Sequence, residues 1–197
     1  STALATYSMA AFKNVEALVY TGPSNSKLTG NSISNSIYGG LSVKNTINGG
    51  DGDDYLFGGD TTDSLYGGNG NDTIAVTRWN GNPSGSLGTA LRTNSGNDTL
   101  DGGAGDDWYV VSSQTAFNFQ DTLGSNTIAS TVDFSLKYNS NISANIQNLY
   151  LIGDSNLRGT GSDIANLITG NDGANSIAAG SGNDTVYASV SYTLGAN

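Results

Sequence analysis

Aspartate recurs in this chain at a spacing that could hold metal ions. The stretch from Gly49 to Ala75 reads GGDGDDYLF GGDTTDSLY GGNGNDTIA, three versions of one nine-residue unit. The sixth position of the unit is Asp in these copies and in three others, and it is Asn in four more. The Asp residues are Asp54, Asp63, Asp72, Asp98, Asp107 and Asp184, and the Asn residues are Asn35, Asn45, Asn166 and Asn175. This regular spacing predicts one kind of site that is built repeatedly.

The glycines of the unit allow positive φ, so backbone carbonyl groups can turn toward one point. If each unit is half a coil, units eighteen residues apart lie on the same side, so that Asp54 stacks over Asp72 and Asn45 over Asp63. Two coils would then offer carboxylate and carbonyl oxygens to the gap between them. A hard cation that accepts about six to eight oxygens in a flexible geometry is calcium, whereas magnesium demands a tighter octahedron.

We therefore predict that calcium is held by sixth-position side chains, by turn glycines and by the acidic residues between them. The predicted set is Asn45, Gly50, Asp51, Gly52, Asp54, Asp60, Asp63, Gly68, Gly70, Asp72, Gly96, Asp98, Gly103, Gly105, Asp107, Gly182 and Asp184. Asp121 lies outside the nine-residue units, and its replacement is expected to leave calcium binding unchanged.

The eighth position of each unit is apolar, or Tyr in one unit, which favours a short strand over a helix. One apolar residue in nine cannot form a helical stripe, but it suits a strand that points one side chain inward and then turns. Stacked units would line these side chains into a continuous core, so we predict an all-β solenoid. The eighth-position residues are Ile37, Ile47, Leu56, Leu65, Ile74, Leu100, Tyr109, Ile168, Ile177 and Val186.

A longer repeat overlies the short one. Residues 14–39 align without gaps onto residues 145–170, and residues 126–136 onto residues 184–194. These linking pieces alternate apolar and polar residues, which indicates half-buried strands. We expect a first set of strands at 1–29, a block of coils at 30–110 with an inserted loop at 76–92, bridging strands at 111–160, and a second block at 161–197 that stops within a module. The chain is accordingly expected to be a segment of a longer array.

Composition narrows the possible functions. The chain has 17 acidic and 7 basic residues, a net charge of −10, and neither cysteine nor histidine. This balance argues against nucleic acid, which requires clustered basic residues, and against zinc chemistry and thiol catalysis. No apolar run approaches the length of a membrane span. The periodicity already explains the aspartates, so we expect no enzyme activity.

Two units, GGDGDDYLF and GGAGDDWYV, fit the pattern G-G-x-G-x-D-x-U-x with U apolar or aromatic, and the chain resembles the RTX, or hemolysin-type calcium-binding, repeat family. The resemblance implies a parallel β-roll with Ca²⁺ between its turns, here in two blocks bridged by additional strands. It also implies export by a type I system and folding outside the cell. Thr61 departs from the family pattern because it replaces a glycine. The units at 30–38, 161–169 and 170–178, which have Asn at the sixth position, are expected to stack without metal.

The sequence thus predicts a calcium-binding structural module of a secreted or cell-surface bacterial protein, such as an adhesin, an S-layer component or a filament component. Its expected partners are calcium ions, together with neighbouring copies joined head to tail or a cell-surface polysaccharide, and neither nucleic acid nor a membrane. Two alternatives remain at this point. One is an auxiliary or secretion module of a secreted enzyme, of the alginate epimerase, protease or lipase type, and the other is a carbohydrate-binding module.

Overall fold

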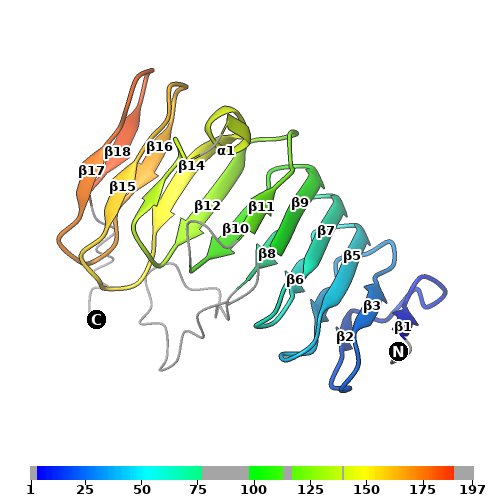
Figure 1. The fold of residues 1–197 in the computed structure, drawn as a ribbon. Helices are drawn as coiled ribbons and strands as arrows, with labels where there is room; N and C mark the ends of the chain where they lie inside the picture. Colours follow the sequence, from blue (N-terminus) through cyan, green and yellow to red (C-terminus); the bar gives the residue numbers. More distant parts are fainter. Residues whose placement is uncertain (1–3, 77–97, 113–116, 139, 189–197) are drawn as a thin grey trace, which may run out of the picture.

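The computed structural model describes residues 4–76, 98–112, 117–138 and 140–188, and these residues form a parallel β-solenoid (Figure 1). The chain passes alternately through two walls, so each coil contributes one strand to each wall. Gly96, most of the inserted loop expected at 76–92, and the end of the second block lie outside the described residues. Among the described residues, no helix is long and apolar enough to cross a membrane.

One wall begins with a six-stranded sheet and continues into a three-stranded one. In spatial order the six strands are β1 (Ala5–Ser8), β3 (Ser26–Thr29), β5 (Asn45–Asp51), β7 (Ser64–Asn69), β9 (Asp98–Ala104) and β11 (Phe117–Phe119). The three further strands are β13 (Phe134–Ser135), β15 (Arg158–Thr160) and β17 (Ser176–Ala178).

The other wall is a single nine-stranded sheet. Its strands, in spatial order from the N-terminal end, are β2 (Ala17–Val19), β4 (Ser36–Tyr38), β6 (Tyr55–Phe57), β8 (Thr73–Ala75), β10 (Trp108–Val111), β12 (Asn126–Ser130), β14 (Ile146–Leu151), β16 (Leu167–Thr169) and β18 (Thr185–Tyr187). A short helix, α1 (Ser140–Asn145), leads into β14.

The register of the strands confirms the predicted coil of eighteen residues. Leu56 on β6 pairs with Ile74 on β8, and Ile47 on β5 pairs with Leu65 on β7. Leu65 pairs in turn with Leu100, because the insertion expected at 76–92 comes between these two coils in the sequence. All of the pairings are parallel, as stacking of successive coils requires.

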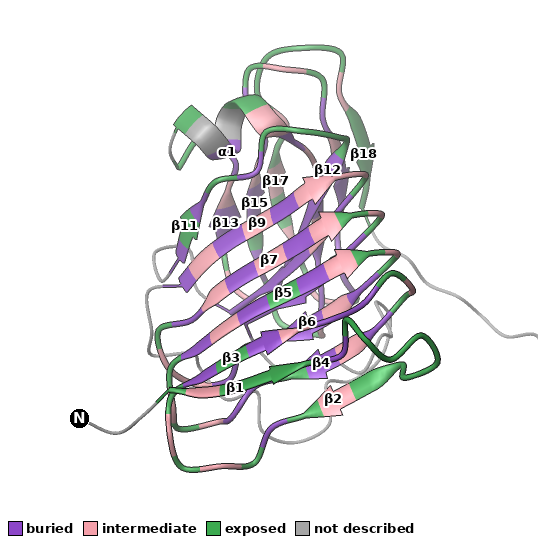
Figure 2. Cartoon of the chain, turned by 90° about the vertical axis from the view of Figure 1, so that its right-hand side faces the viewer, coloured by how far each residue is buried: buried purple, intermediate pink, exposed green. Residues whose placement is uncertain are grey.

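The eighth-position residues form the core, as predicted. Those of the interior coils have no exposed surface: Ile37, Ile47, Leu56, Leu65, Ile74, Leu100, Tyr109 and Ile168. Figure 2 shows the buried positions repeating from strand to strand along the wall that contains β5, β7 and β9. Towards the last coil the burial weakens, because Ile177 is only partly buried and Val186 is 44% exposed.

Candidate metal sites

The sixth-position residues lie just after the glycine turns, at or next to the start of a strand. From coil to coil they are joined by hydrogen bonds into rows along the solenoid, which we call ladders. Each carboxylate accepts a hydrogen bond from the backbone of the sixth-position residue one coil earlier. Asp54 N–H donates to Asp72 Oδ1 at 2.7 Å, and Asp72 N–H donates to Asp107 Oδ1 at 2.7 Å. On the opposite side, Asn45 N–H donates to Asp63 Oδ1 and Asp63 N–H to Asp98 Oδ1, both at 2.7 Å. The stacking of Asp54 over Asp72 and of Asn45 over Asp63, expected from the repeat, is therefore present.

The second carboxylate oxygen of most ladder aspartates is buried without a partner. Oδ2 is inaccessible and has no hydrogen bond in Asp54, Asp63, Asp72 and Asp107, residues that are at most 2% exposed. A buried acceptor without a donor costs free energy, so such atoms are rare in folded proteins. Four of them at equivalent positions indicate that something outside the polypeptide satisfies them.

Each of these oxygens lies beside the first glycine of its own unit. A Cβ built on Gly67 would lie 2.1 Å from Asp72 Oδ2, and 2.5 Å from the carbonyl oxygen of Gly102 in the next coil. The same point on Gly49 lies 2.1 Å from Asp54 Oδ2 and 2.7 Å from Gly67 O. In these two coils a carboxylate oxygen and a carbonyl oxygen thus share a small space, and Oδ2 has no hydrogen-bond donor. Two acceptors in this arrangement repel one another, and a cation would bind both.

Asn45 shows how the same space is filled without a metal. Its Nδ2 donates to the carbonyl oxygen of Gly58 in the next coil at 2.6 Å and to Gly40 O at 3.0 Å. Its Oδ1 accepts hydrogen bonds from Gly40 N–H at 2.9 Å and from the Ser26 hydroxyl at 2.8 Å. The amide therefore binds the carbonyl that faces a bare oxygen in the Asp coils. Because the Asn45 amide is satisfied within the chain, we propose that this coil closes its gap without calcium, in contrast to the expectation that Asn45 is a ligand.

Burial raises the pKa of the ladder aspartates. The pKa of Asp54 is about 6, and that of Asp63, Asp72 and Asp107 is about 7. Loss of solvent is the main cause in each case, and the backbone N–H of the preceding coil opposes it by stabilising the charged form. The neighbouring carboxylate of Asp54 further raises the pKa of Asp72. Carboxylates that resist ionisation in the chain alone become favourable ligands once a cation neutralises them.

The turns between strands use glycine because no other residue fits. Gly50, Gly52, Gly68, Gly70, Gly103, Gly105 and Gly182, all predicted from the sequence, have φ between +98° and +135°. A Cβ on Gly68 would lie 1.9 Å from the carbonyl oxygen of Gly50 in the coil before it. Successive turns therefore stack with their backbones in contact, which brings carbonyl oxygens to the gaps beside the carboxylates.

The remaining predicted residues lie in different surroundings. Asp51 is exposed and accepts a hydrogen bond from the Asn69 amide at 2.8 Å, so it lies on the outer rim of the turns. Asp60 is partly exposed in the turn that contains Thr61. The Thr61 hydroxyl donates to Val43 O at 2.7 Å and so occupies a carbonyl of the preceding coil. Asp98 is 1% exposed and belongs to the ladder.

The Asp107 ladder continues to Asn126, whose Oδ1 accepts a hydrogen bond from Asp107 N–H at 3.0 Å, and a contact between Asp121 and Tyr109 that the repeat pattern did not predict lies beside it. Asp121 is 1% exposed, and its carboxylate accepts hydrogen bonds from the Tyr109 hydroxyl and from Leu123 N–H. The Tyr109 hydroxyl also accepts from Gly102 N–H at 2.7 Å. The Tyr109 hydroxyl lies beside Gly102. Beside Gly49 and Gly67, the corresponding place is occupied by a carbonyl oxygen of the next coil. Asp121 also raises the pKa of Asp107. In contrast to the expectation from the repeat, we therefore propose that replacing Asp121 alters calcium binding beside Asp107.

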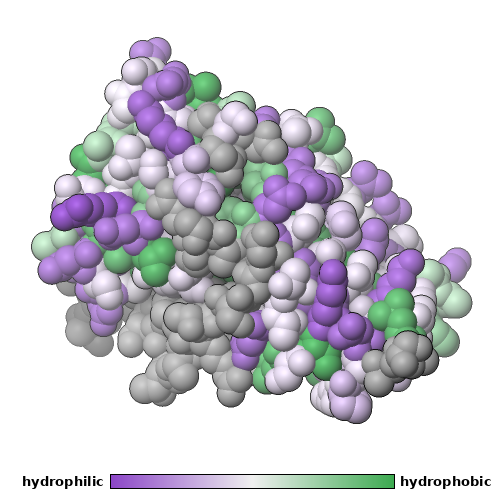
Figure 3. Space-filling model, viewed as in Figure 1, coloured by the Kyte–Doolittle hydropathy of each residue, from purple (hydrophilic) through white to green (hydrophobic). Residues whose placement is uncertain are grey.

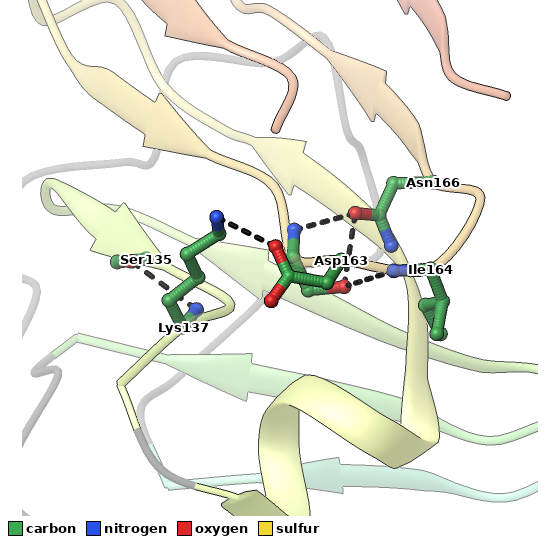
Figure 4. A network of polar contacts seen from close by, with 6 residues as sticks. Ser135, Lys137, Asp163, Ile164 and Asn166 are labelled. Atoms are coloured by element: carbon green, nitrogen blue, oxygen red, sulfur yellow. Dashed lines mark hydrogen bonds and ion pairs between the residues drawn. The ribbon is translucent and has the colours of Figure 1, made fainter. Parts of the chain in front are cut away.

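The second block relies more on amides than on carboxylates. Asn166 Oδ1 accepts hydrogen bonds from Ser162 N–H at 2.6 Å and from the Ser162 hydroxyl at 3.1 Å (Figure 4). Beside it, Lys137 Nζ and Asp163 Oδ1 form an ion pair at 2.8 Å, which is exposed and contributes little stability. Asn166 N–H donates to Asp184 Oδ1 at 2.9 Å, so Asp184 continues the ladder towards the last coil.

The donor set fits calcium and requires backbone ligands. Within the described ranges, no three acidic side chains come together closely enough to hold a metal by themselves. Carbonyl oxygens must therefore supplement the one or two carboxylates at each gap, as is common for calcium and unsuited to zinc. The ladder aspartates and the stacked turn carbonyls meet this requirement.

Comparison with known families agrees with this geometry. A family model of the RTX calcium-binding nonapeptide repeat matches residues 40–74, 88–113 and 160–190, in four copies. These segments contain all of the ladder aspartates. A search of curated protein sequences gave no significant match.

Proposed function

The chain carries RTX calcium-binding nonapeptide repeats, and we propose that it is a structural module of a secreted or cell-surface bacterial protein that folds when it binds calcium outside the cell. The rigid rod that results would serve an adhesin, an S-layer or a filament. A β-roll of this kind is a calcium-binding scaffold and is not catalytic by itself.

The observation that carries this proposal is the set of unpartnered Oδ2 atoms. Asp54 and Asp72 each place a buried carboxylate oxygen beside a carbonyl oxygen of the next coil, and Asn45 closes the equivalent gap with an N–H. Bound calcium would supply the positive charge that these oxygens lack. The chain's own part is to hold the oxygens in position with the ladder hydrogen bonds and to exclude water by stacking its turns.

The same arrangement would make folding of the chain depend on the calcium concentration, which differs between the cytosol and the outside of the cell. Without a cation, stacked carboxylates repel and the turn glycines favour the unfolded chain through their conformational entropy. Extracellular calcium modules bind with dissociation constants of about 10⁻⁴–10⁻³ M. Millimolar external calcium would therefore fill these sites, and the much lower cytosolic concentration would leave the chain unfolded for export.

Limited proteolysis tests the folding part of this proposal. In saturating calcium the coils should resist a protease that degrades the chain rapidly in a chelator, and magnesium should give little protection. Equal digestion in calcium and in chelator would contradict the proposal. The cellular part is tested separately, by labelling intact cells of the producing bacterium with an antibody to the chain. Staining that requires permeabilised cells would exclude a surface location.

A further inference from the structure

The coil that follows Asp107 places a carboxylate where the coils before it place a backbone carbonyl. The register of β11 against β9, continued past the end of β11, sets Asp121 level with Gly102, the first glycine of its unit. At the equivalent places beside Gly49 and Gly67, a carbonyl oxygen of the next coil approaches the ladder carboxylate. The gap next to Asp107 therefore differs in kind from the other gaps of the same ladder.

Tyr109 holds the Asp121 side chain in this place. The tyrosine ring is part of the core, and its hydroxyl accepts a hydrogen bond from Gly102 N–H at 2.7 Å and donates one to Asp121 Oδ2. Leu123 N–H donates to Asp121 Oδ1 at 3.0 Å. Each carboxylate oxygen can accept a second contact. Asp121 is thus fixed by the chain and still able to bind a cation.

Asp107 and Asp121 are two buried carboxylates that face the same gap. They are 0% and 1% exposed. A Cβ on Gly102 would lie 2.6 Å from the Tyr109 hydroxyl and closer still to Asp107 Oδ2, so this unpartnered oxygen lies near the hydroxyl that binds Asp121. After burial and the neighbouring Asp72, the charge of Asp121 and a contact with its side chain raise the pKa of Asp107. An ionised carboxylate has no hydrogen to donate, so this contact leaves Asp107 Oδ2 unsatisfied.

We propose that Asp107 and Asp121 form a two-carboxylate calcium site that binds its ion more tightly than the other gaps of this ladder. The inference rests on the proposed calcium function of the module. Two buried charges of the same sign at close range cannot both persist without a counter-charge. Calcium affinity rises with the number of charged ligands and with the rigidity of the site. Here a carboxylate replaces a neutral carbonyl, and Tyr109 restricts its movement.

The site lies at the border between two kinds of coil. On its far side the ladder is continued by amides, because Asp107 N–H donates to Asn126 Oδ1 at 3.0 Å and Asn126 N–H donates to the Gln147 side chain at 2.8 Å. In Figure 1 β9 and β11 adjoin in the middle of the solenoid, so the site is well inside the stack. Calcium bound there would join the carboxylate coils to the amide coils, and it would be the first ion of this ladder to bind as the concentration rises.

Calorimetric titration of the whole chain with calcium tests this site. We expect Asp121→Asn to remove the tightest binding step, because an amide at this position would satisfy Asp107 Oδ2 with a hydrogen, as Asn45 satisfies a carbonyl. The lowest dissociation constant of the chain should therefore rise by about tenfold or more. Asp72→Asn should instead remove a weaker step and leave the tightest one in place.

Asp154→Asn is the matched control, because it makes the same charge change at an exposed residue outside the ladders. Figure 3 shows hydrophilic side chains spread over the visible surface, and this control measures what the loss of one surface carboxylate does to calcium binding. The tightest step should be unchanged in this variant.

Tyr109→Phe tests the positioning role of the hydroxyl while keeping the buried ring. We expect the tightest dissociation constant to rise, by less than in Asp121→Asn, with the same β signal in circular dichroism at saturating calcium. A purely structural role would instead lower that saturated signal and leave the dissociation constant unchanged. Tyr109→Phe also decides the question if Asp121→Asn fails to fold, since an unchanged dissociation constant would then overturn the site.

The outcomes separate this site from the function of the module. If the parent chain binds calcium and Asp121→Asn retains the tightest step as Asp154→Asn does, the two-carboxylate site is wrong. Asp107 and Asp121 would then share a proton, and the proposed function would stand. If the parent chain binds no calcium, the proposed function fails together with this site.

Discussion

At the scale of single residues, the choice between Asp and Asn at the sixth position decides what closes the gap between two coils. Asn45 donates to the carbonyl of Gly58 at 2.6 Å, whereas Asp72 presents a bare oxygen to the carbonyl of Gly102. The two side chains have nearly the same shape and differ by a charge and two hydrogens. One ladder therefore contains both rungs that are satisfied within the chain and rungs that we propose to depend on a cation.

Replacing Asp72 with Asn should convert one kind of rung into the other. We expect Asp72→Asn to bind fewer calcium ions and to have a more stable calcium-free state than the parent, because a buried charge is replaced by a donor that reaches Gly102 O. Asp72→Ala, which supplies neither ligand nor donor, should raise the calcium midpoint by about tenfold. Calorimetric titration measures the number of calcium ions bound. Circular dichroism of the two chains in chelator measures the second effect, because the variant should keep more β signal than the parent.

Asp154→Asn is the matched control, because Asp154 is exposed and outside the ladder while the charge change is identical. Equal effects of the two Asn substitutions on calcium binding would contradict the assignment of Asp72 as a ligand.

The raised pKa values predict opposite effects of pH with and without calcium. The pKa of Asp63, Asp72 and Asp107 is about 7 in the folded chain, against 3.8 for a free side chain. The calcium-free fold therefore holds more protons than the unfolded chain between about pH 4 and pH 7, and its stability falls as pH rises through this window. In chelator, acidification from pH 8 to pH 5 should increase the β signal in circular dichroism.

Calcium binding should respond in the other direction, because protons compete with the cation for the same oxygens. The calcium midpoint is expected to rise as pH falls from 8 to 5. A midpoint that is constant over this range would show that the ladder carboxylates are not the ligands.

At the scale of the elements, the turn glycines determine how closely successive coils can stack. Gly68 has a φ of +122°, and a Cβ there would lie 1.9 Å from Gly50 O. We expect Gly68→Ala to lower the free energy of unfolding in saturating calcium by at least about 2 kcal/mol, because it combines backbone strain with displacement of the neighbouring turn.

Gly159→Ala provides the comparison, since Gly159 lies in β15 without a positive φ and its added Cβ would meet only side-chain atoms at 3.3 Å or more. A denaturant titration of both variants gives the comparison directly. If Gly159→Ala proved the more destabilising of the two, the close contact between turns would not be the limiting feature.

The sequence predicted the stacked coils well because the repeat encodes them directly. The repeat places an apolar residue every nine positions and a turn glycine before each aspartate. This pattern predicts Leu56 and Ile74 in the core and Asp72 in the ladder, and all three lie there. Asp121 and Tyr109 were not predicted as a pair. Asp121 occupies the position of a first glycine in a coil that has lost the glycine pair, and Tyr109 occupies an apolar position. Their contact depends on the hydroxyl reaching across the coil, which spacing alone does not reveal.

At the scale of the whole molecule, the solenoid is a stack in which each described strand pairs with strands of the adjacent coils. The stability of such a stack is the sum of the stability of each coil and of the interfaces between adjacent coils, so an interface with unsatisfied polar atoms weakens it. Interior coils bury their eighth-position residues completely, whereas Val186 in the last coil is 44% exposed. The interior coils are thus the best packed of the described residues, and calcium is the component that we propose makes them cohesive.

The most direct test of this account is a circular-dichroism titration with calcium after treatment with a chelator. The account predicts that the chain gains parallel β-sheet signal with a midpoint of about 10⁻⁴–10⁻³ M calcium, and that magnesium at the same concentrations does not substitute. A chain that is already folded in chelator, or one that gains no β signal by about 10 mM calcium, well above the weakest affinity of extracellular calcium modules, would contradict it.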